Sequence, residues 1–361
     1  MEAHIVGAGI AGFSAARALR KLNYKVTIWE KENLPCVYAS SRNAAIMRTY
    51  ECDPEISKLV KRNYVLLKEL GWAGQSMLDQ RGLFIRPMEI DYYESSFLKK
   101  HPQMTELKSE KKEITLESGI NLAGQFIPGN GVIDIHAMQA WFQEELRNTG
   151  VAINYNSEVS NIQSADERLT GFGLANGEDV RLNNNDLFVM CGGSWSAQIF
   201  KDNNLWAPPL FAHKRHLYFI KGPKPPAADS PVIWDERNDI YFRPEGEGYL
   251  ATHCDQRETD PDDYNSDELE TDRFLSAITS VYPFFKEYYI SKYWACLRTF
   301  TLDNLPVVGF DPRLSNALWY CGFGGRGMSM ALSASEYLEN QIASGNLSSD
   351  FENPLNPGRF L

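Results

Sequence analysis

Cysteine is scarce in this sequence, and its spacing excludes two kinds of small stabilised domain. Six cysteines occur among 361 residues, and no two of them form a CxxC pair. Neither a disulfide framework nor a zinc ribbon is therefore indicated, and the pattern fits a reducing cytoplasm. His213 and His216 have a spacing that a metal ion could use, but no carboxylate lies near them in the sequence. We expect a cytoplasmic protein without a metal site.

Long apolar runs and surplus positive charge are also lacking. No stretch approaches the ~18 apolar residues that a membrane-spanning helix requires, and the mean hydropathy is −0.37. The opening residues, MEAHIVG, contain neither a basic nor a long apolar segment, so no secretory signal is visible. With 36 Lys and Arg against 47 Asp and Glu, the net charge is −11, which makes nucleic acid a poor default partner. Since 43 % of the residues are apolar, we expect a soluble protein with a sizeable core.

The pattern of apolar residues predicts alternating strands and helices in the first half of the chain and at its end. A strand, a glycine turn, a helix and a second strand open the sequence, which is the first half of a dinucleotide-binding unit. The run LFVMC, followed by two glycines, is typical of a fully buried strand. We expect strands at residues 4–6, 25–30, 151–155, 187–191 and 318–321, and helices at 13–22, 54–70, 135–148 and from the last glycine turn to about 343.

The segment between residues 205 and 295 is different, being rich in aromatic residues and strand patterns. Residues 255–272 carry nine acidic residues and few apolar ones, which indicates a solvated loop and the start of a helix, with a mobile lid as the alternative. The length fits two domains, with this β-rich layer interrupting the α/β one. We expect a small hairpin layer at 156–180 and strands at 215–221, 232–234, 239–242, 249–253 and 291–297.

Residues 7–12, GAGIAG, match the pattern G-x-G-x-x-G in a context that makes it specific. The turn follows a strand and opens a helix, and the next strand ends in Glu30, 18 residues after Gly12. Gly7 permits the tight turn, Gly9 lets the backbone approach a pyrophosphate, and Gly12 allows close packing of helix on strand. Unpaired N–H groups at the helix start attract that pyrophosphate. The Glu30 carboxylate can accept hydrogen bonds from both hydroxyls of an adenosine ribose, so the motif predicts a dinucleotide site.

A second glycine turn, GFGGRG at residues 322–327, also lies between a strand and a helix. It cannot begin another dinucleotide domain, because only 34 residues follow and they contain no second strand ending in an acid. It does direct another helix N-terminus at the cofactor region. That positive end suits an anionic reduced flavin, whereas a nicotinamide loses its charge on reduction, so the sequence favours a flavin.

Further motifs occur at four separated places: ASSRNAA at residues 39–45, VID at 132–134, MCGGSWS at 190–196 and LRTFTLDNLPVVG at 297–309. In this order, with the two glycine turns, they resemble the D-amino-acid oxidase superfamily of FAD-dependent oxidoreductases, which includes glycine oxidase, D-amino-acid dehydrogenase and monomeric sarcosine oxidase. The resemblance covers essentially the whole chain. It implies an α/β fold in which a Rossmann-type FAD-binding domain is joined to an antiparallel-sheet α+β substrate domain.

The resemblance also implies domain limits and FAD contacts. The FAD-binding domain is expected to be discontinuous, over residues 1–80, 130–204 and 296–361, with the substrate-binding domain at 81–129 and 205–295. The expected FAD contacts gather at the two glycine turns and the segments between them. They are Gly7, Gly9, Ile10, Ala11, Gly12, Glu30, Lys31, Ser40, Ser41, Arg42, Asn43, Ala44, Val159, Gly192, Gly193, Trp195, Arg298, Gly324, Gly325, Arg326, Gly327 and Met328.

Two residues are candidates for binding and orienting a substrate. Arg298 lies where the resemblance implies an arginine that holds the substrate carboxylate, and a guanidinium offers a matching pair of donors. A structural ion pair is the alternative, and Thr299 replaces the proline common in the family. Tyr241 resembles the tyrosine that shares carboxylate binding, although an aromatic residue on a strand often belongs to the core. Arg326 and His253 are weaker candidates for the same pocket.

Cys296 falls where sarcosine-oxidase-like members carry the cysteine that bonds the flavin 8α carbon, whereas glycine oxidases have glycine there. Because buried unmodified cysteine is common, noncovalent FAD is the favoured expectation and a covalent link at Cys296 is the alternative. Sarcosine-oxidase-like members also have a lysine that promotes reaction with oxygen, but the corresponding stretch, CDQRE at 254–258, has none. The missing lysine argues against a dedicated oxygen site. The electron acceptor that reoxidises the flavin is therefore expected to be either oxygen or another compound.

Together these features predict an enzyme that oxidises the C–N bond of an amino acid or secondary amine by hydride transfer to flavin N5, giving an imine that hydrolyses. One alternative is flavin-dependent modification of the tRNA wobble uridine in the methylaminomethyluridine pathway, because GRGM at 325–328 and PLNPGRF at 354–360 also resemble the flavin domain of that enzyme. The acidic balance argues against this alternative. A flavin-binding protein without turnover is the third interpretation.

Overall fold

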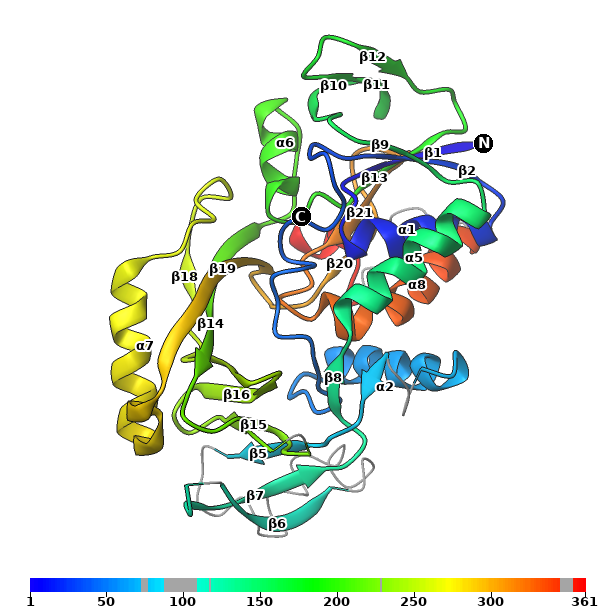
Figure 1. The fold of residues 1–361 in the computed structure, drawn as a ribbon. Coiled ribbons are helices and arrows are strands. Elements are labelled where there is room, and N and C mark those ends of the chain that lie inside the picture. Colours follow the sequence, from blue (N-terminus) through cyan, green and yellow to red (C-terminus); the bar gives the residue numbers. More distant parts are fainter. Residues whose placement is uncertain (73–76, 88–108, 117, 228, 345–352) are drawn as a thin grey trace.

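Two large sheets with different strand directions organise the chain (Figure 1). The computed structural model describes residues 1–72, 77–87, 109–116, 118–227, 229–344 and 353–361. The first sheet is parallel except where its edge strand β20 meets β21. Its strands, from one edge to the other, are β20 (Val307–Phe310), β21 (Ala317–Cys321), β13 (Leu187–Met190), β1 (Glu2–Val6), β2 (Lys25–Trp29) and β9 (Ala152–Asn154).

Both faces of the first sheet are covered, which explains why its strands are almost continuous apolar runs. One face carries three helices, with a fourth packed on the last of them: α1 (Ile10–Lys21), α5 (Ile135–Asn148), α8 (Gly327–Ala343) and α2 (Pro54–Glu69). The other face carries a small sheet, β10 (Val159–Ala165), β11 (Arg168–Leu174) and β12 (Asp179–Arg181), and helix α6 (Ser196–Asp202) behind the 3-10 turn η2 (Gly193–Trp195). The 3-10 turn η4 (Pro357–Phe360) lies beside β20.

The second sheet has nine strands and is antiparallel except for one parallel pair, β15 with β5. Helix α7 (Glu268–Val281) and the 3-10 turn η3 (Pro283–Glu287) cover one of its faces. Its strands are β5 (Leu83–Arg86), β6 (Glu110–Thr115), β7 (Asn121–Ile127), β14 (Leu210–Lys221), β15 (Val232–Asp235), β16 (Ile240–Glu245), β17 (Gly248–Thr252), β18 (Arg257–Glu258) and β19 (Tyr289–Thr301). A three-stranded sheet, β3 (Ile46–Met47), β8 (Gly131–Ile133) and β4 (Leu78–Asp79), lies between the two large sheets in the chain path.

Helix starts follow from local sequence at three places. Asp53, Asp134 and Asp267 precede α2, α5 and α7, and each aspartate accepts hydrogen bonds from N–H groups of the first helical turn. Helix α1 differs, because Gly9 precedes it and has no side chain to cap it, and Ser40 Oγ accepts from the Ile10 N–H at 2.9 Å instead. The remaining N–H groups of that turn are donors that another group can use.

The predicted fold class is confirmed, and most predicted elements lie within a few residues of the observed ones. Helix α5 has the predicted bounds. Helix α1 begins at Ile10, before the predicted start, because the Phe13 N–H donates to the Gly9 carbonyl and the glycine turn itself becomes helical. Strand β20 was not predicted, since its four residues are all buried and lack alternation.

Strands β14 and β19 extend beyond their predicted limits, to Leu210 and Thr301 respectively. They pair with each other along almost their whole length, and residues near the shared end are buried or partly buried on both faces, which hides the alternation of a half-exposed strand. Helix α7 begins at Glu268, as the acidic segment predicts. No described helix is both long and apolar enough to cross a bilayer.

Asp235, at the end of β15, links the second sheet to Tyr282, which follows α7. The contribution of this link to stability can be tested. The Asp235 side chain is fully buried and accepts hydrogen bonds from Arg86 Nη1 (3.0 Å), Tyr282 Oη (2.7 Å) and Asn238 Nδ2 (2.8 Å). We expect Asp235→Ala to lower the free energy of unfolding by about 3 kcal/mol, because a partly buried cation and a buried phenol lose their acceptor. Urea denaturation of the apoprotein measures this, with the exposed Glu287→Ala as control. Equal stability of the two variants would contradict the prediction.

Candidate active site

A cavity of about 400 Å³ lies where the carboxyl ends of the parallel strands meet the second sheet. It begins after β1, β2, β13 and β21, at residues such as Gly7, Glu30, Gly192 and Gly322. It continues to side chains of β14, β16 and β19. Ligands of open α/β sheets bind at this edge of the strands, so the cavity is the candidate active site.

The first glycine turn is shaped by close backbone approaches. Gly7 has a φ of +99°, and a Cβ there would lie 2.8 Å from the carbonyl oxygen of Cys191. A Cβ on Gly12 would lie 1.9 Å from the Gly7 oxygen, so α1 can begin directly behind β1 only with glycine at this position. Gly9 is different, because a Cβ there would meet only Ser40 Oγ, at 3.2 Å. Gly9 therefore leaves room on the side of the cavity.

Glu30 lies in the cavity wall directly after β2 and is 8 % exposed. One carboxylate oxygen accepts from the Ala8 N–H at 2.6 Å, and the other accepts from the Glu32 N–H at 2.9 Å. These two bonds hold the carboxylate at the strand end, next to the glycine turn. A carboxylate has further acceptor capacity beyond two bonds, so this geometry suits the ribose hydroxyls that the sequence predicts.

The second glycine turn packs against two arginines. A Cβ on Gly325 would lie 2.7 Å from Arg298 Cδ, and a Cβ on Gly324 would lie 3.0 Å from Arg326 Nη1. Both glycines have positive φ, of +57° at Gly324 and +82° at Gly325. The turn thus makes space for the two guanidinium groups and also starts α8, whose first turn contains no acidic residue.

Most predicted cofactor contacts line this one cavity, although they come from seven separate segments. Three do not: Gly12 packs inside the turn, Ser41 Oγ donates to the Cys36 carbonyl, and Arg42 Nε donates to the Val37 carbonyl at 3.1 Å. Those that line it are Gly7, Gly9, Ile10, Ala11, Glu30, Lys31, Ser40, Asn43, Ala44, Val159, Gly192, Gly193, Trp195, Arg298, Gly324, Gly325, Arg326, Gly327 and Met328.

These residues fit FAD on two observations from the structure. The α1 N-terminus opens beside Gly9 and has no acidic residue in its first turn, so an anionic pyrophosphate would find N–H donors and positive potential there. Two guanidinium nitrogens, Arg298 Nε and Arg326 Nη1, are buried and have no hydrogen-bond partner among the described residues. Buried donors are rarely left unpaired, so the two nitrogens indicate that the cavity takes a ligand with acceptor groups near them.

Arg298 and Tyr241, the predicted substrate residues, both line the cavity. Arg298 Nη2 donates to the Asp255 carbonyl and to Gln256 Oε1, each at 3.3 Å, and no described Asp or Glu forms an ion pair with Arg298. Burial, together with the nearby positive charge of Arg215, lowers the pKa of Arg298 to about 10, so the guanidinium is still protonated at neutral pH. A protonated, desolvated guanidinium without a carboxylate partner is a site for an anion.

Arg215 was not predicted from the sequence, yet it lies beside Arg298. Its Nε donates to the Asp255 carbonyl at 2.8 Å, so the two arginines share one acceptor oxygen. The Arg215 guanidinium lies 5.9 Å from the ring centroid of Tyr241. Burial raises the pKa of Tyr241 to about 12, so its hydroxyl keeps its proton and can donate it to an anion.

A second group of cavity residues was also missed. Glu51 Oε1 accepts from Arg48 Nη2 at 2.8 Å, and Glu51 Oε2 lies 3.1 Å from Arg326 Nε. The Arg48 guanidinium lies 4.4 Å from the ring of Trp234, which stacks on Tyr241 at 4.8 Å. Arg48 and Glu51 lie in the loop between β3 and α2, so no helix or strand periodicity in the sequence relates them.

The prediction for His253 is wrong. Its Nε2 lies 3.0 Å from Glu270 of α7, and the residue is not part of the cavity. Thr252 pairs with Tyr241 and shares its face of the sheet, so the next residue faces the helix. Cys296 does line the cavity, and burial raises the pKa of its thiol to about 11.

The two histidines considered for a metal cannot share one ion. His213 and His216 lie three positions apart in β14 and so face opposite sides of the sheet. His213 packs on Phe300 with 5.1 Å between ring centroids, whereas His216 bonds to Asp255. Within the described ranges, no group of three or more His, Cys, Asp or Glu residues could hold a metal ion.

Comparisons with known proteins agree with this geometry. The family described as DAO, FAD dependent oxidoreductase, matches residues 2–341. A curated D-amino acid dehydrogenase of Vibrio atlanticus (strain LGP32) is 23 % identical over 263 residues, which make up 69 % of this chain and 59 % of that protein. This chain spans between 35 % and 59 % of the length of the first curated relatives that it matches.

Solved structures share the whole fold at low sequence identity. The structure of L-proline dehydrogenase from P. horikoshii has a TM-score of 0.83 and 19 % identity, and the match covers 99 % of this chain and 97 % of the other. Glycine oxidase from Bacillus cereus ATCC 14579 has a TM-score of 0.77 and 18 % identity, with 98 % and 99 % covered. Both matches extend over the parallel sheet and the antiparallel sheet together.

The different surroundings of Gly9 and Gly12 give a prediction about FAD. We expect Gly9→Val to fold, because its Cβ meets only one side-chain oxygen, but to bind FAD on the order of a hundredfold more weakly, or about 3 kcal/mol. Gly12→Val should fail to fold stably, because its Cβ would collide with backbone. Thermal unfolding of the apoproteins and FAD titration separate these effects. Normal FAD affinity in Gly9→Val would contradict the assignment of the cavity.

Proposed function

This chain belongs to the DAO family of FAD-dependent oxidoreductases, as its motifs predict, and on that premise we propose that it oxidises the C–N bond of an amino acid or secondary amine. The observation that carries the proposal is Arg298, a protonated guanidinium in the cavity with a buried, unpartnered Nε and no carboxylate partner among the described residues. An amino acid supplies that carboxylate.

The chain's own residues suffice to hold FAD without a covalent bond. The α1 N-terminus would receive the pyrophosphate, Glu30 the ribose hydroxyls, and the α8 N-terminus the polar edge of the flavin ring. Bound FAD supplies a two-electron acceptor, which takes a hydride at its N5 atom. Lys31 and Trp195 complete the wall near Glu30, with Lys31 Nζ 3.7 Å from the Trp195 ring.

Arg298 and Tyr241 would bind the substrate carboxylate and so fix the direction of the Cα–H bond. The guanidinium donates two parallel hydrogen bonds and the phenol donates a third. Trp234 and Leu217 line the same cavity, and their apolar surfaces would exclude water from the reacting carbon. Positioning of this kind accounts for a large part of the rate in reactions that need no covalent catalysis.

No protein base is required by this chemistry. The amine reacts in its neutral form, Cα loses a hydride, and the nitrogen lone pair forms the C=N bond of an iminium ion. Water then adds to the carbon and releases the amine, leaving a carbonyl product. The reaction therefore requires an anion site to hold the substrate and an apolar wall around the reacting carbon. It does not require a His and Asp pair to act as a base. The reduced flavin would be reoxidised by oxygen or by another electron acceptor. The protein is proposed to work in the cytoplasm.

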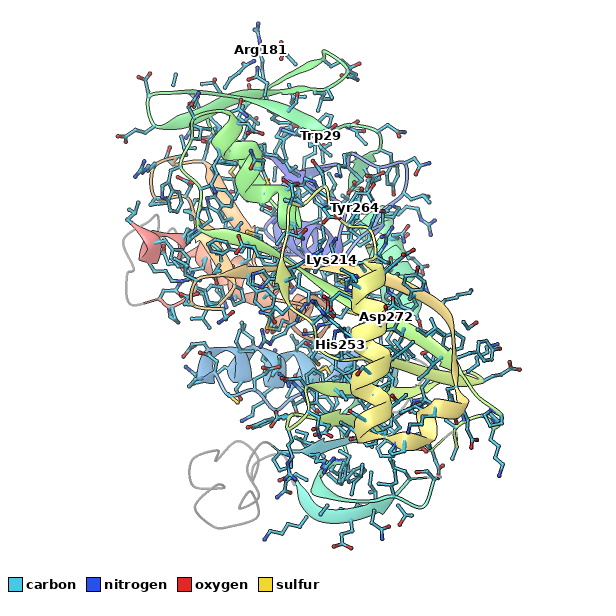
Figure 2. All side chains as sticks on the ribbon, turned by 90° about the vertical axis from the view of Figure 1, so that its left-hand side faces the viewer. Trp29, Arg181, Lys214, His253, Tyr264 and Asp272 are labelled. Carbon is cyan, nitrogen blue, oxygen red and sulfur yellow. The ribbon has the colours of Figure 1, made fainter. Side chains whose placement is uncertain are left out.

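Arg298 provides the direct test of this proposal. We expect Arg298→Ala to keep its flavin but to lose roughly 3 kcal/mol or more of transition-state binding, about a hundredfold in kcat/KM, because a desolvated charge pair is lost. Arg298→Lys should recover only part of the loss, since an ammonium lacks the planar fork. Arg181→Ala, an exposed residue at the far end of the molecule (Figure 2), is the control. Release of carbonyl product and amine is the measurement, and parental turnover in Arg298→Ala would contradict the role.

The second prediction concerns Cys296 and the flavin. Its thiol is buried and protonated, which favours an unmodified side chain. We therefore expect acid precipitation of the holoenzyme to leave a yellow supernatant and a colourless pellet. A yellow pellet that becomes colourless in Cys296→Ser would demonstrate the covalent alternative.

A further inference from the structure

The acidic segment 255–267, called the strap below, connects β17 to α7 and contains the short edge strand β18, which pairs with β14. Beyond β18 the strap contacts two aromatic residues outside the second sheet. Asp262 Oδ1 accepts from the Trp195 indole N–H at 2.8 Å, and the Tyr264 ring packs edge-on against Tyr38 with 5.2 Å between centroids. Figure 2 shows Tyr264 between Trp29, at the end of β2, and Lys214 of β14.

The two partners of the strap are walls of the cofactor cavity. Trp195 and Tyr38 both line it and pack on each other at 4.6 Å between ring centroids. The Tyr38 hydroxyl donates to the Glu32 carboxylate, and the Glu32 N–H donates to Glu30 Oε1 at 2.9 Å. A continuous set of contacts therefore runs from Tyr264, which is outside the cavity, to the carboxylate proposed to bind the ribose.

His216 closes the base of the strap. Its Nδ1 lies 2.8 Å from Asp255 Oδ2, and its Nε2 lies 2.9 Å from the N–H of Asp267. Since a backbone N–H can only donate, Nε2 carries no proton, and the proton on Nδ1 is donated to Asp255. One imidazole thus joins the first and last residues of the strap.

A buried lysine fixes the strap a second time. Lys214 is 1 % exposed, and its Nζ lies 2.7 Å from Asp263 Oδ1. Because a buried ammonium without a partner is costly, Asp263 must stay close to β14. The adjacent residues Asp262 and Tyr264 are thereby presented to Trp195 and Tyr38. The base of the strap also holds the anion site, through the bonds from Arg215 and Arg298 to the Asp255 carbonyl.

We propose that Asp262 and Tyr264 are positioning residues for FAD, acting from the substrate side through Trp195 and Tyr38. This inference rests on the proposed function, because it requires FAD in the cavity. Outside β18, the strap residues are exposed or half-buried and few are apolar, so these contacts determine the position of that part of the strap. Retention of FAD would therefore depend on two side chains that are not part of the cavity wall.

FAD release from the full-length holoenzyme tests the proposal. We expect Asp262→Ala and Tyr264→Ala each to release FAD roughly threefold to tenfold faster than the parent, the range for losing one hydrogen bond or one aromatic pair. Flavin in the ultrafiltrate, followed over time after removal of free FAD, is the readout. Asp272→Ala, an exposed residue of α7 (Figure 2), should release FAD at the parental rate.

Conservative variants separate positioning from a structural role. Asp262→Asn keeps an acceptor for the indole and Tyr264→Phe keeps the ring pair, so both should release FAD at the parental rate. The melting temperatures of the apoproteins should be equal in all variants. Unchanged release in both alanine variants would overturn the inference and leave FAD binding intact, whereas a parent protein that takes up no FAD would overturn the proposed function itself.

Discussion

One close approach of backbone to backbone determines the geometry of the cofactor end. A Cβ on Gly12 would lie 1.9 Å from the Gly7 oxygen, so only glycine lets α1 begin immediately behind β1. Strand β1 is central in its sheet, with β2 and β13 on its two sides. The α1 N-terminus therefore points at the ends of three neighbouring strands, and the residues after each strand become the walls of one cavity.

At the other end of the cavity, charge decides which ligand fits. Glu51 forms ion pairs with both Arg48 and Arg326, and the negative charge of Glu236 also stabilises the Arg48 cation. Arg215 lies 3.9 Å from Asp255, whose carboxylate also bonds to His216. Arg298 is left without a carboxylate partner in the described part of the chain. A cavity with one uncompensated guanidinium is suited to a ligand with one carboxylate, which is the feature that the proposed function relies on.

Local features of the sequence predict the cofactor end well, because the glycine turn, Glu30 and the α8 turn each act within a few residues of a strand end. The substrate end depends on pairing between distant segments. Arg215 joins Arg298 only because β14 pairs with β19, which sets Arg215 opposite Cys296. No local pattern encodes that register. His253 was misplaced for the same reason, since a shift of one residue in β17 changes which face a side chain occupies.

The strap illustrates a further limit of sequence reasoning. Its acidic composition predicts a solvated loop, and many of its residues are indeed exposed. Its proposed role depends on contacts with His216, Lys214 and Trp195, which come from other elements. Composition predicts that such a segment is exposed to solvent. The residues that it contacts are determined by the tertiary structure.

The central claim is that an amino acid held by Arg298 transfers a hydride to bound FAD. Anaerobic mixing of the holoenzyme with a panel of amino acids and N-methyl amines tests it most directly, with the visible flavin absorbance as readout. The account predicts that at least one carboxylate-bearing amine bleaches the flavin and that one carbonyl product forms per flavin reduced. Stable yellow colour with every amine, in protein that holds its full complement of FAD, would contradict the account and indicate a flavin-binding protein without this turnover.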